Sequence, residues 1–288
     1  MAVILSIIGV LINGFIVAVN LIDWLKRKTI SHIDQIIIVL GVSRICFHAS
    51  SFLYTLLDVL FLSQNFLIHL YVIKIILTFF NHFSFWVMTL LSVVFCLKIS
   101  NFHHLFLLRL KIITTQKVAH VIVVLAMFSI CYIFLIFLIE HIEFPKDLMR
   151  NVTSGGSKIP QGSAMLLFLF LLGNSVPSIV FCTSSALMIV SLSCHIHRMK
   201  LNETPTSNLD TYYNVIKFMT LFLTYYVIIT VICVMVIYSH FFYSLDIIWV
   251  YITVNIFPNL HSTCLVLWTT KLRERFYKIF QCLSNRQI

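Results

Sequence analysis

The chain has 288 residues, of which 60% are apolar and only 10% are charged. A soluble domain has about a quarter charged residues, so this chain has too few polar side chains to cover itself in water. Glycine and proline are scarce, with 7 and 5 residues, which favours continuous helices. The long apolar runs also lack the alternating pattern of a membrane β-barrel. The composition therefore predicts an all-α membrane protein.

Seven apolar runs follow one another along the chain. A helix needs about 20 apolar residues to cross the hydrocarbon core of a bilayer. Each run meets this length, so we expect a bundle of seven transmembrane helices that forms one domain over residues 1–288. The expected spans are, in chain order, Val3–Ile22, Gln35–Leu60, Leu70–Cys96, Val118–Ile139, Ala164–Ser193, Phe218–Tyr238 and Ile247–Trp268.

The positive charges collect in every second gap between these runs. Fifteen of the 20 lysines and arginines lie in residues 26–28, 98–117, 198–217 and 271–286. Because basic loops stay on the cytoplasmic side, the N-terminus is predicted outside and the C-terminus inside. Topology and attraction to anionic lipid account for the net charge of +10. The short basic gaps carry no nucleic-acid-binding pattern, so nucleic acid is not an expected partner.

Two glycosylation sequons carry opposite expectations under this topology. The triplet Asn151-Val152-Thr153 falls in the second outer gap, where glycosylation can occur. The triplet Asn202-Glu203-Thr204 falls in the third cytoplasmic gap and should stay unmodified. Asn151 is therefore the expected glycosylation site.

One arginine lies well inside a predicted span. Arg44 is about two turns past the cytoplasmic start of the second span. An unpaired charge at this depth costs several kcal/mol, so Arg44 should face the bundle interior and bond to polar groups there. A structural tether is the simpler interpretation, and a direct part in switching stays open.

No enzyme or metal site is visible in the chain. The eight cysteines have no CxxC or Cys/His metal spacing, and the His-Glu-x-x-His motif is absent. The pairs His103-His104 and His195-x-His197 have no carboxylate nearby as a third ligand. Paired intramembrane carboxylates or a repeated half-chain would indicate a transporter, and neither occurs. We therefore expect no catalytic residue, metal or cofactor.

Short motifs in five of the spans indicate which class of seven-helix membrane protein this chain resembles. Asp-Arg-Tyr, expected of rhodopsin-like receptors after the third span, is replaced by Lys98-Ile99-Ser100, and Asn-Pro-x-x-Tyr in the seventh by His261-Ser262. The motifs are Asn13-Gly14-Phe15-Ile16, Leu40-Gly41-Val42-Ser43-Arg44-Ile45, Asn81-His82-Phe83-Ser84-Phe85-Trp86 with Lys98-Ile99-Ser100, Ser191-Leu192-Ser193-Cys194-His195, and Pro258 with His261-Ser262. With these motifs, the chain from Gly9 to Phe276 closely resembles the bitter taste receptors (taste receptors type 2), a family of G-protein-coupled receptors. Vomeronasal type 1 pheromone receptors are the alternative.

The resemblance implies a site for small bitter agonists between the helices. Phe83, Trp86 and Leu90 have the spacing i, i+3, i+7 and share a helix face. In the resembled family the tryptophan forms part of the cavity, and Tyr251 and Ile229 match a pocket position and an activation-linked position. Leu90 stands where many members have asparagine, so we expect apolar or aromatic agonists with Tyr251 as the polar anchor. That Trp86 and its neighbours only pack helices remains the alternative.

A basic collar is predicted on the cytoplasmic face. Its simplest role is to set the membrane topology and to contact membrane lipid. The resemblance adds coupling to a gustducin-type, inhibitory-class G protein, followed by phospholipase C and calcium release. Because Asp-Arg-Tyr is absent, the residue that holds the resting state is undetermined, and Arg44 or Lys98 can serve instead. His261 belongs to the same set of candidate G-protein and switch residues. The residues of the basic collar are Lys98, Arg109, Lys111, His195, Arg198, Lys217 and Lys271.

Overall fold

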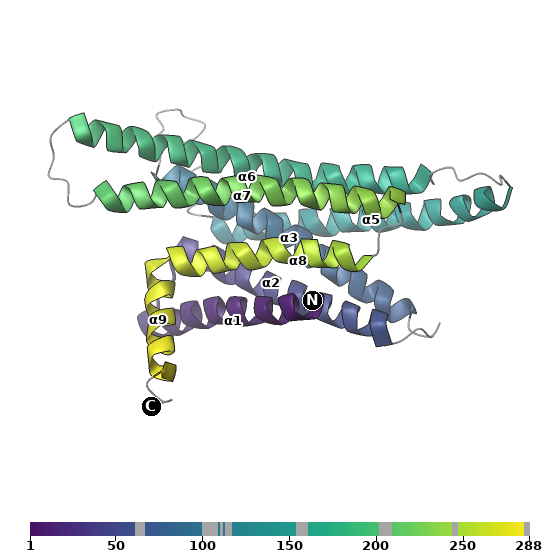
Figure 1. Ribbon diagram of the computed structural model, residues 1–288, viewed down its shortest axis with the longest axis horizontal. Coiled ribbons are helices and arrows are strands. Elements are labelled where there is room, and N and C mark those ends of the chain that lie inside the picture. Colours follow the sequence, from purple (N-terminus) through teal and green to yellow (C-terminus); the bar gives the residue numbers. More distant parts are fainter. Residues whose placement is uncertain are drawn as a thin grey trace. The chain divides into compact units, whose positions relative to one another are not determined.

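The computed structural model describes residues 1–60, 67–99, 109, 112, 117–153, 161–201, 209–243 and 247–284, with some side chains inside these helices outside the description. Over these residues the regular structure is helical (Figure 1). The helices are α1 (Ala2–Arg27), α2 (His32–Leu60), α3 (Leu67–Ile99), α5 (Val118–Thr153), α6 (Gln161–Leu201), α7 (Leu209–Tyr243), α8 (Ile247–Trp268) and α9 (Thr270–Ser284).

The predicted spans agree with these helices. Each span lies within one helix, and the seventh coincides with α8. In the described part of the chain, five helices are long and apolar enough to cross a membrane, and α7 holds a shorter apolar stretch at Met219–Ile232. The prediction of an all-helical membrane protein is confirmed. The five long stretches are Val3–Arg27, His32–Leu57, Ile68–Lys98, Val118–Ile142 and Leu171–Arg198.

The helices form two compact units. The first unit contains residues 1–84 and 245–288, and the second contains residues 85–244. In the first unit, α1 packs against α2 and α8, and α2 also contacts α8. In the second unit, α6 packs against both α5 and α7 (Figure 1). The first unit therefore joins the two ends of the chain, because α1 and α8 are neighbours despite their separation in sequence.

A tight turn connects α1 to α2. Lys28 has a φ of 55°, the left-handed conformation that commonly ends a helix, and its N–H donates to the carbonyl of Trp24 at 2.8 Å. Ser31 then caps α2, since its Oγ accepts from the N–H of Asp34 at 3.1 Å. The Asp34 carboxylate in the first turn is also favoured by the positive end of the helix dipole.

Close approach between helices requires glycine at position 9. A Cβ on Gly9 of α1 would overlap the imidazole of His48 on α2 and the side-chain amide of Asn259 on α8. Small residues allow membrane helices to pack at short distance, where polar side chains can bond across the interface. Gly9 therefore sets the spacing at which the polar side chains of this unit meet.

The basic tail of the sequence, for which no helix was predicted, forms α9. Leu272, Phe276 and Ile279 recur at helical spacing and give α9 an apolar stripe, although Phe276 and Ile279 are exposed, as are Arg273 and Lys278. Leu272 is fully buried, and the ring of Phe276 contacts Phe15 of α1 with centroids 5.9 Å apart. In Figure 1, α9 turns away from α8 and lies across the end of α1.

Candidate functional site

Arg44 is the centre of a buried polar network in the first unit. Its side chain is only 2% exposed and reaches from α2 to α8. One nitrogen, Nη1, lies 2.9 Å from His261 Nδ1 and donates to Ser262 Oγ at 2.7 Å. Ser262 in turn donates to Asn13 Oδ1 on α1 at 2.8 Å, so the network ties three helices together. Arg44 does face the bundle interior, as its position in the sequence predicted.

The donors and acceptors of this network define its chemistry. A guanidinium group can only donate, so His261 accepts at Nδ1. Asn13 Nδ2 donates back to the carbonyl of Gly9 at 2.8 Å, which completes the chain of bonds on α1. Among the described residues, Arg44 Nε has no hydrogen-bond partner. Burial of a cation whose donors are only partly bonded carries a desolvation cost, which offsets part of the stability that the hydrogen bonds supply.

A second buried network lies one turn along α2. His48 Nδ1 is 2.9 Å from Asn255 Oδ1 on α8, and Asn255 Nδ2 donates to Ser51 Oγ at 2.8 Å. An amide oxygen can only accept, so His48 donates from Nδ1. Neighbouring Asn259 donates to the carbonyl of Leu5 on α1 at 2.9 Å. The α2–α8 interface is therefore lined with polar contacts over more than one turn.

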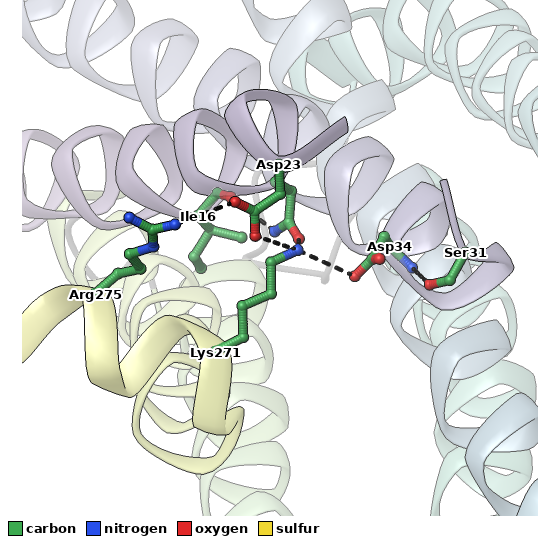
Figure 2. Close-up of polar contacts among 7 residues, drawn as sticks. Ile16, Asp23, Ser31, Asp34, Lys271 and Arg275 are labelled. Atoms are coloured by element: carbon green, nitrogen blue, oxygen red, sulfur yellow. Dashed lines mark hydrogen bonds and ion pairs between the residues drawn. The ribbon is translucent and has the colours of Figure 1, made fainter. Parts of the chain in front are cut away.

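A cluster of charges joins α9 to the end of α1 and the start of α2 (Figure 2). Lys271 Nζ donates to Asn20 Oδ1 at 2.9 Å and forms ion pairs with Asp23 at 3.2 Å and Asp34 at 3.7 Å. Arg275, one turn further along α9, lies 3.5 Å from the other oxygen of Asp23. The Lys271 side chain is 28% exposed and that of Asp23 is 13% exposed, so water screens these pairs only in part. The cluster fixes the direction in which α9 leaves α8.

Replacing Lys271 with methionine should lower the free energy of unfolding by about 1 to 2 kcal/mol. The substitution keeps the aliphatic stem, but it removes the cation between two carboxylates. Thermal unfolding of the purified chain at low and high salt measures this loss, which should shrink as salt rises. Lys278→Met, at an exposed position of the same helix, is the matched control. Equal effects of the two substitutions would show that the cluster does not hold α9.

Hydroxyl groups join α3 to α6 in the second unit. Ser92 Oγ lies 2.8 Å from Ser184 Oγ and 3.1 Å from Ser185 Oγ. Thr89 Oγ1 donates to the carbonyl of Pro177 at 3.1 Å. Hydroxyl pairs of this kind hold membrane helices together where no water competes for them.

Comparison with known proteins decides the family. A model of the family described as "Taste receptor protein (TAS2R)" matches residues 1–284. The chain belongs to the type 2 taste receptor family. It is 32% identical to taste receptor type 2 member 140 of Rattus norvegicus over 97% of this chain and 91% of that protein. Member 125 of the same species is 31% identical over 93% and 88%, and member 30 of Homo sapiens is 36% identical over 69% and 62%.

Family membership has two direct consequences. The chain is a taste-family receptor and not an enzyme, because the family consists of receptors. It is also a multi-pass membrane protein, because the family match and the long apolar helices both indicate a chain that crosses the membrane several times. The resemblance predicted from the short motifs is confirmed.

The structure places the predicted ligand residues of this taste receptor on three helices. On α3, Phe83 and Leu90 are buried at 8% and 7% exposure, and Phe83 stacks on Phe79 with ring centroids 5.8 Å apart. Trp86 is less buried, and its ring meets Phe128 of α5 edge to face at 5.4 Å. The side chains of Ile229 on α7 and Tyr251 on α8 lie outside the described residues.

The predicted collar residues divide into two groups. Lys271 forms the ion pairs with Asp23 and Asp34 described above. The others whose side chains are described are exposed: Lys98, Arg109, His195, Arg198 and Lys217. Lys111 lies outside the described residues, and so does the side chain of Asn151, whose backbone belongs to α5.

Several polar contacts of this taste receptor were not predicted from the sequence. They are the contacts of Asn255 and Ser51, and the pairing of Asp23 and Asp34 with Lys271. Asn255, Asn259 and Ser262 recur at spacings of four and three residues along α8. This polar stripe on an apolar helix is the signal that could have predicted the α1–α2–α8 networks.

Proposed function

We propose that this chain is a plasma-membrane G-protein-coupled receptor for bitter-tasting small molecules. The observation that carries the proposal is the family match over residues 1–284. In this proposal a gustducin-type G protein transmits the signal to phospholipase C, which leads to calcium release. The named relatives are taste receptors, which supports a sensory ligand over a transported solute.

The proposed topology is a single domain of seven spans with the N-terminus outside. The first five spans correspond to the long apolar stretches of α1, α2, α3, α5 and α6, and α7 and α8 supply the sixth and seventh. The basic gaps then fall on the cytoplasmic side, together with α9. In this orientation the Lys271 cluster is at the cytoplasmic ends of α1, α2 and α8.

Glycosylation tests this topology. Asn151→Gln should remove a glycan and increase the mobility of the chain on a gel, whereas Asn202→Gln should change nothing, because only outer segments meet the glycosylation enzymes. Digestion of the wild-type chain with an endoglycosidase gives the reference shift. A shift caused by Asn202→Gln would reverse the proposed orientation.

The proposed ligand site includes Phe83, Trp86 and Leu90 of α3, with Ile229 and Tyr251 from α7 and α8. Trp86 is the principal contact, since it is less buried than Phe83 and Leu90. An indole ring offers an apolar face and one N–H donor, which suits uncharged aromatic ligands. Leu90 adds no polar group, which supports a preference for apolar agonists.

The proposed G-protein site is the exposed part of the basic collar. Lys98, His195, Arg198 and Lys217 are exposed and can meet an acidic partner surface. Lys271 is already paired with Asp23 and Asp34, so its part in the proposal is to hold α9 in place. The Arg44–His261 contact is the proposed resting-state lock, because it joins α2 to α8 deep in the bundle.

Calcium release is the direct test of the proposed function. Cells that express this chain with a chimeric gustducin-type Gα are exposed to a panel of bitter compounds, and surface level is measured in parallel. A saturable response that needs both the chain and the chimeric Gα supports the proposal. Silence across a broad panel at good surface expression would count against a bitter ligand and favour a pheromone-like one.

A further inference from the structure

Helix α6 has a weak point at Pro177. Proline has no backbone N–H, so the carbonyl of Gly173 cannot receive the usual bond from the residue four positions later. A helix bends most easily where such a bond is missing. The part of α6 beyond Pro177 leads to His195 and Arg198 of the basic collar, so a change of angle here would move collar residues.

Two neighbouring helices contact α6 at this weak point. From α3, Thr89 Oγ1 donates to the carbonyl of Pro177 at 3.1 Å. From α7, the hydroxyl of Tyr226 donates to Ser178 Oγ at 2.8 Å. The two contacts fall on consecutive residues of α6, so both neighbours hold the helix where its own hydrogen bonding is weakest.

Tyr226 is well placed to fix α7 against α6. Its side chain is 1% exposed, and its ring lies 4.5 Å from that of Phe181, one turn further along α6. Ser178 Oγ also donates to the carbonyl of Asn174 at 2.7 Å, which orients its oxygen as the acceptor for Tyr226. A partly buried hydroxyl pair with defined geometry and a ring contact beside it restrains both sliding and rotation of the helices.

Beyond Pro177, α6 is tied to α3. Ser184 and Ser185 both contact Ser92, two turns past the Tyr226 contact. This leaves α3 and α6 joined at the weak point and again two turns beyond it. Movement of α7 relative to this pair would have to change the Tyr226 contact.

On this basis, and resting on the proposed receptor function, we propose that Tyr226 is a positioning residue for activation. Its hydroxyl holds α7 against α6 beside Pro177 in the inactive arrangement. Activation releases this bond, so that α7 can move away from α6. The residue acts through Ser178 and need not touch the agonist.

Tyr226→Phe is the cleanest test, because it removes the hydroxyl and keeps the ring. Ser178 retains its bond to Asn174, so the substitution leaves that hydroxyl paired. Loss of one net hydrogen bond should raise agonist-independent signalling per surface receptor about 2- to 10-fold. Tyr225→Phe removes the same group from the adjacent residue of α7 and is the matched control. Unchanged or lowered basal signalling in Tyr226→Phe would overturn the proposal.

A double-mutant cycle tests the partner. Ser178→Ala should raise basal signalling as Tyr226→Phe does, and the double variant should add nothing to the larger single effect. Additive effects would show that the two residues act separately and would also overturn the proposal.

Hydrogen exchange of the purified receptor supplies a readout that needs no agonist or G protein. Tyr226→Phe should speed amide exchange in α7 around residues 217–228, and Tyr225→Phe should not. If the wild-type chain fails to signal at all while exchange behaves as expected, the proposed function fails and the α6–α7 contact stands. If the wild type signals and the two tyrosine variants exchange equally, the proposed role of Tyr226 fails.

Discussion

Replacing Arg44 with alanine is expected to lower the free energy of unfolding by about 2 to 4 kcal/mol. The substitution removes the two hydrogen bonds to α8, each about 1.5 to 3 kcal/mol for a charged donor, and leaves a cavity in the bundle. Relief of the desolvation of a partly paired cation offsets a portion of this loss. The thermal midpoint of the purified receptor and its surface level in cells measure the effect.

Variants of similar size separate the causes. Arg44→Met fills most of the space without donors, so it isolates the hydrogen bonds to His261 and Ser262. Arg44→Lys keeps the charge but lacks the planar fork of a guanidinium, so it should fall between methionine and the wild type. Arg198→Ala, an exposed arginine of α6, is the control and should leave the midpoint unchanged. If Arg44→Ala has the same thermal midpoint as the wild type, Arg44 does not act as a structural tether.

The same variants test the proposed lock. If Arg44 holds the resting arrangement, Arg44→Met should raise agonist-independent signalling per surface receptor, because the α2–α8 contact that favours that state is lost. We expect this rise to accompany the loss of stability. If Arg44→Met shows normal basal signalling and a normal agonist response, the role of Arg44 is limited to packing.

Replacing Trp86 with alanine should raise the agonist concentration for half-maximal response at least about tenfold. Loss of a buried aromatic contact with a ligand costs more than about 1.4 kcal/mol, which corresponds to that factor. Trp86 is the α3 residue of the proposed site with the most accessible surface, so it should carry more of this energy than Phe83 or Leu90. Dose–response curves for calcium release at matched surface level measure the shift.

Packing must be separated from ligand contact. Trp86 also meets Phe128, so Phe128→Ala removes the partner and leaves the indole in place. Trp24→Ala, at a partly exposed position of α1, controls for the loss of any tryptophan. A shift in Phe128→Ala as large as that in Trp86→Ala would show that Trp86 acts by packing α3 on α5 and not by touching the agonist.

The local pattern of the chain predicted much of the architecture. The limits of α8 agree with the predicted seventh span, and every other predicted span lies inside one helix. Apolar length is a property of consecutive residues, so a window of about 20 residues contains the information. The inward position of Arg44 could also be predicted, because a lone charge at that depth has few alternatives in a bilayer.

The helix α9 was not predicted from the sequence. The tail is basic, although Leu272, Phe276 and Ile279 recur in it at helical spacing. That stripe is short, and whether a short amphipathic stretch forms a helix depends on what its apolar side meets. The contact between Phe276 and Phe15 of α1 supplies that partner.

By itself, then, the sequence determined the class of protein, the position of its helices, its family and the interior place of Arg44. Only the tertiary structure decided the partners: His261 and Ser262 for Arg44, Asp23 and Asp34 for Lys271, and Ser178 for Tyr226. Hydropathy is read along the chain, whereas a bond between helices depends on how each helix is rotated and shifted against its neighbour. Close packing across the interface sets that rotation and shift, as the approach of α2 and α8 at Gly9 illustrates.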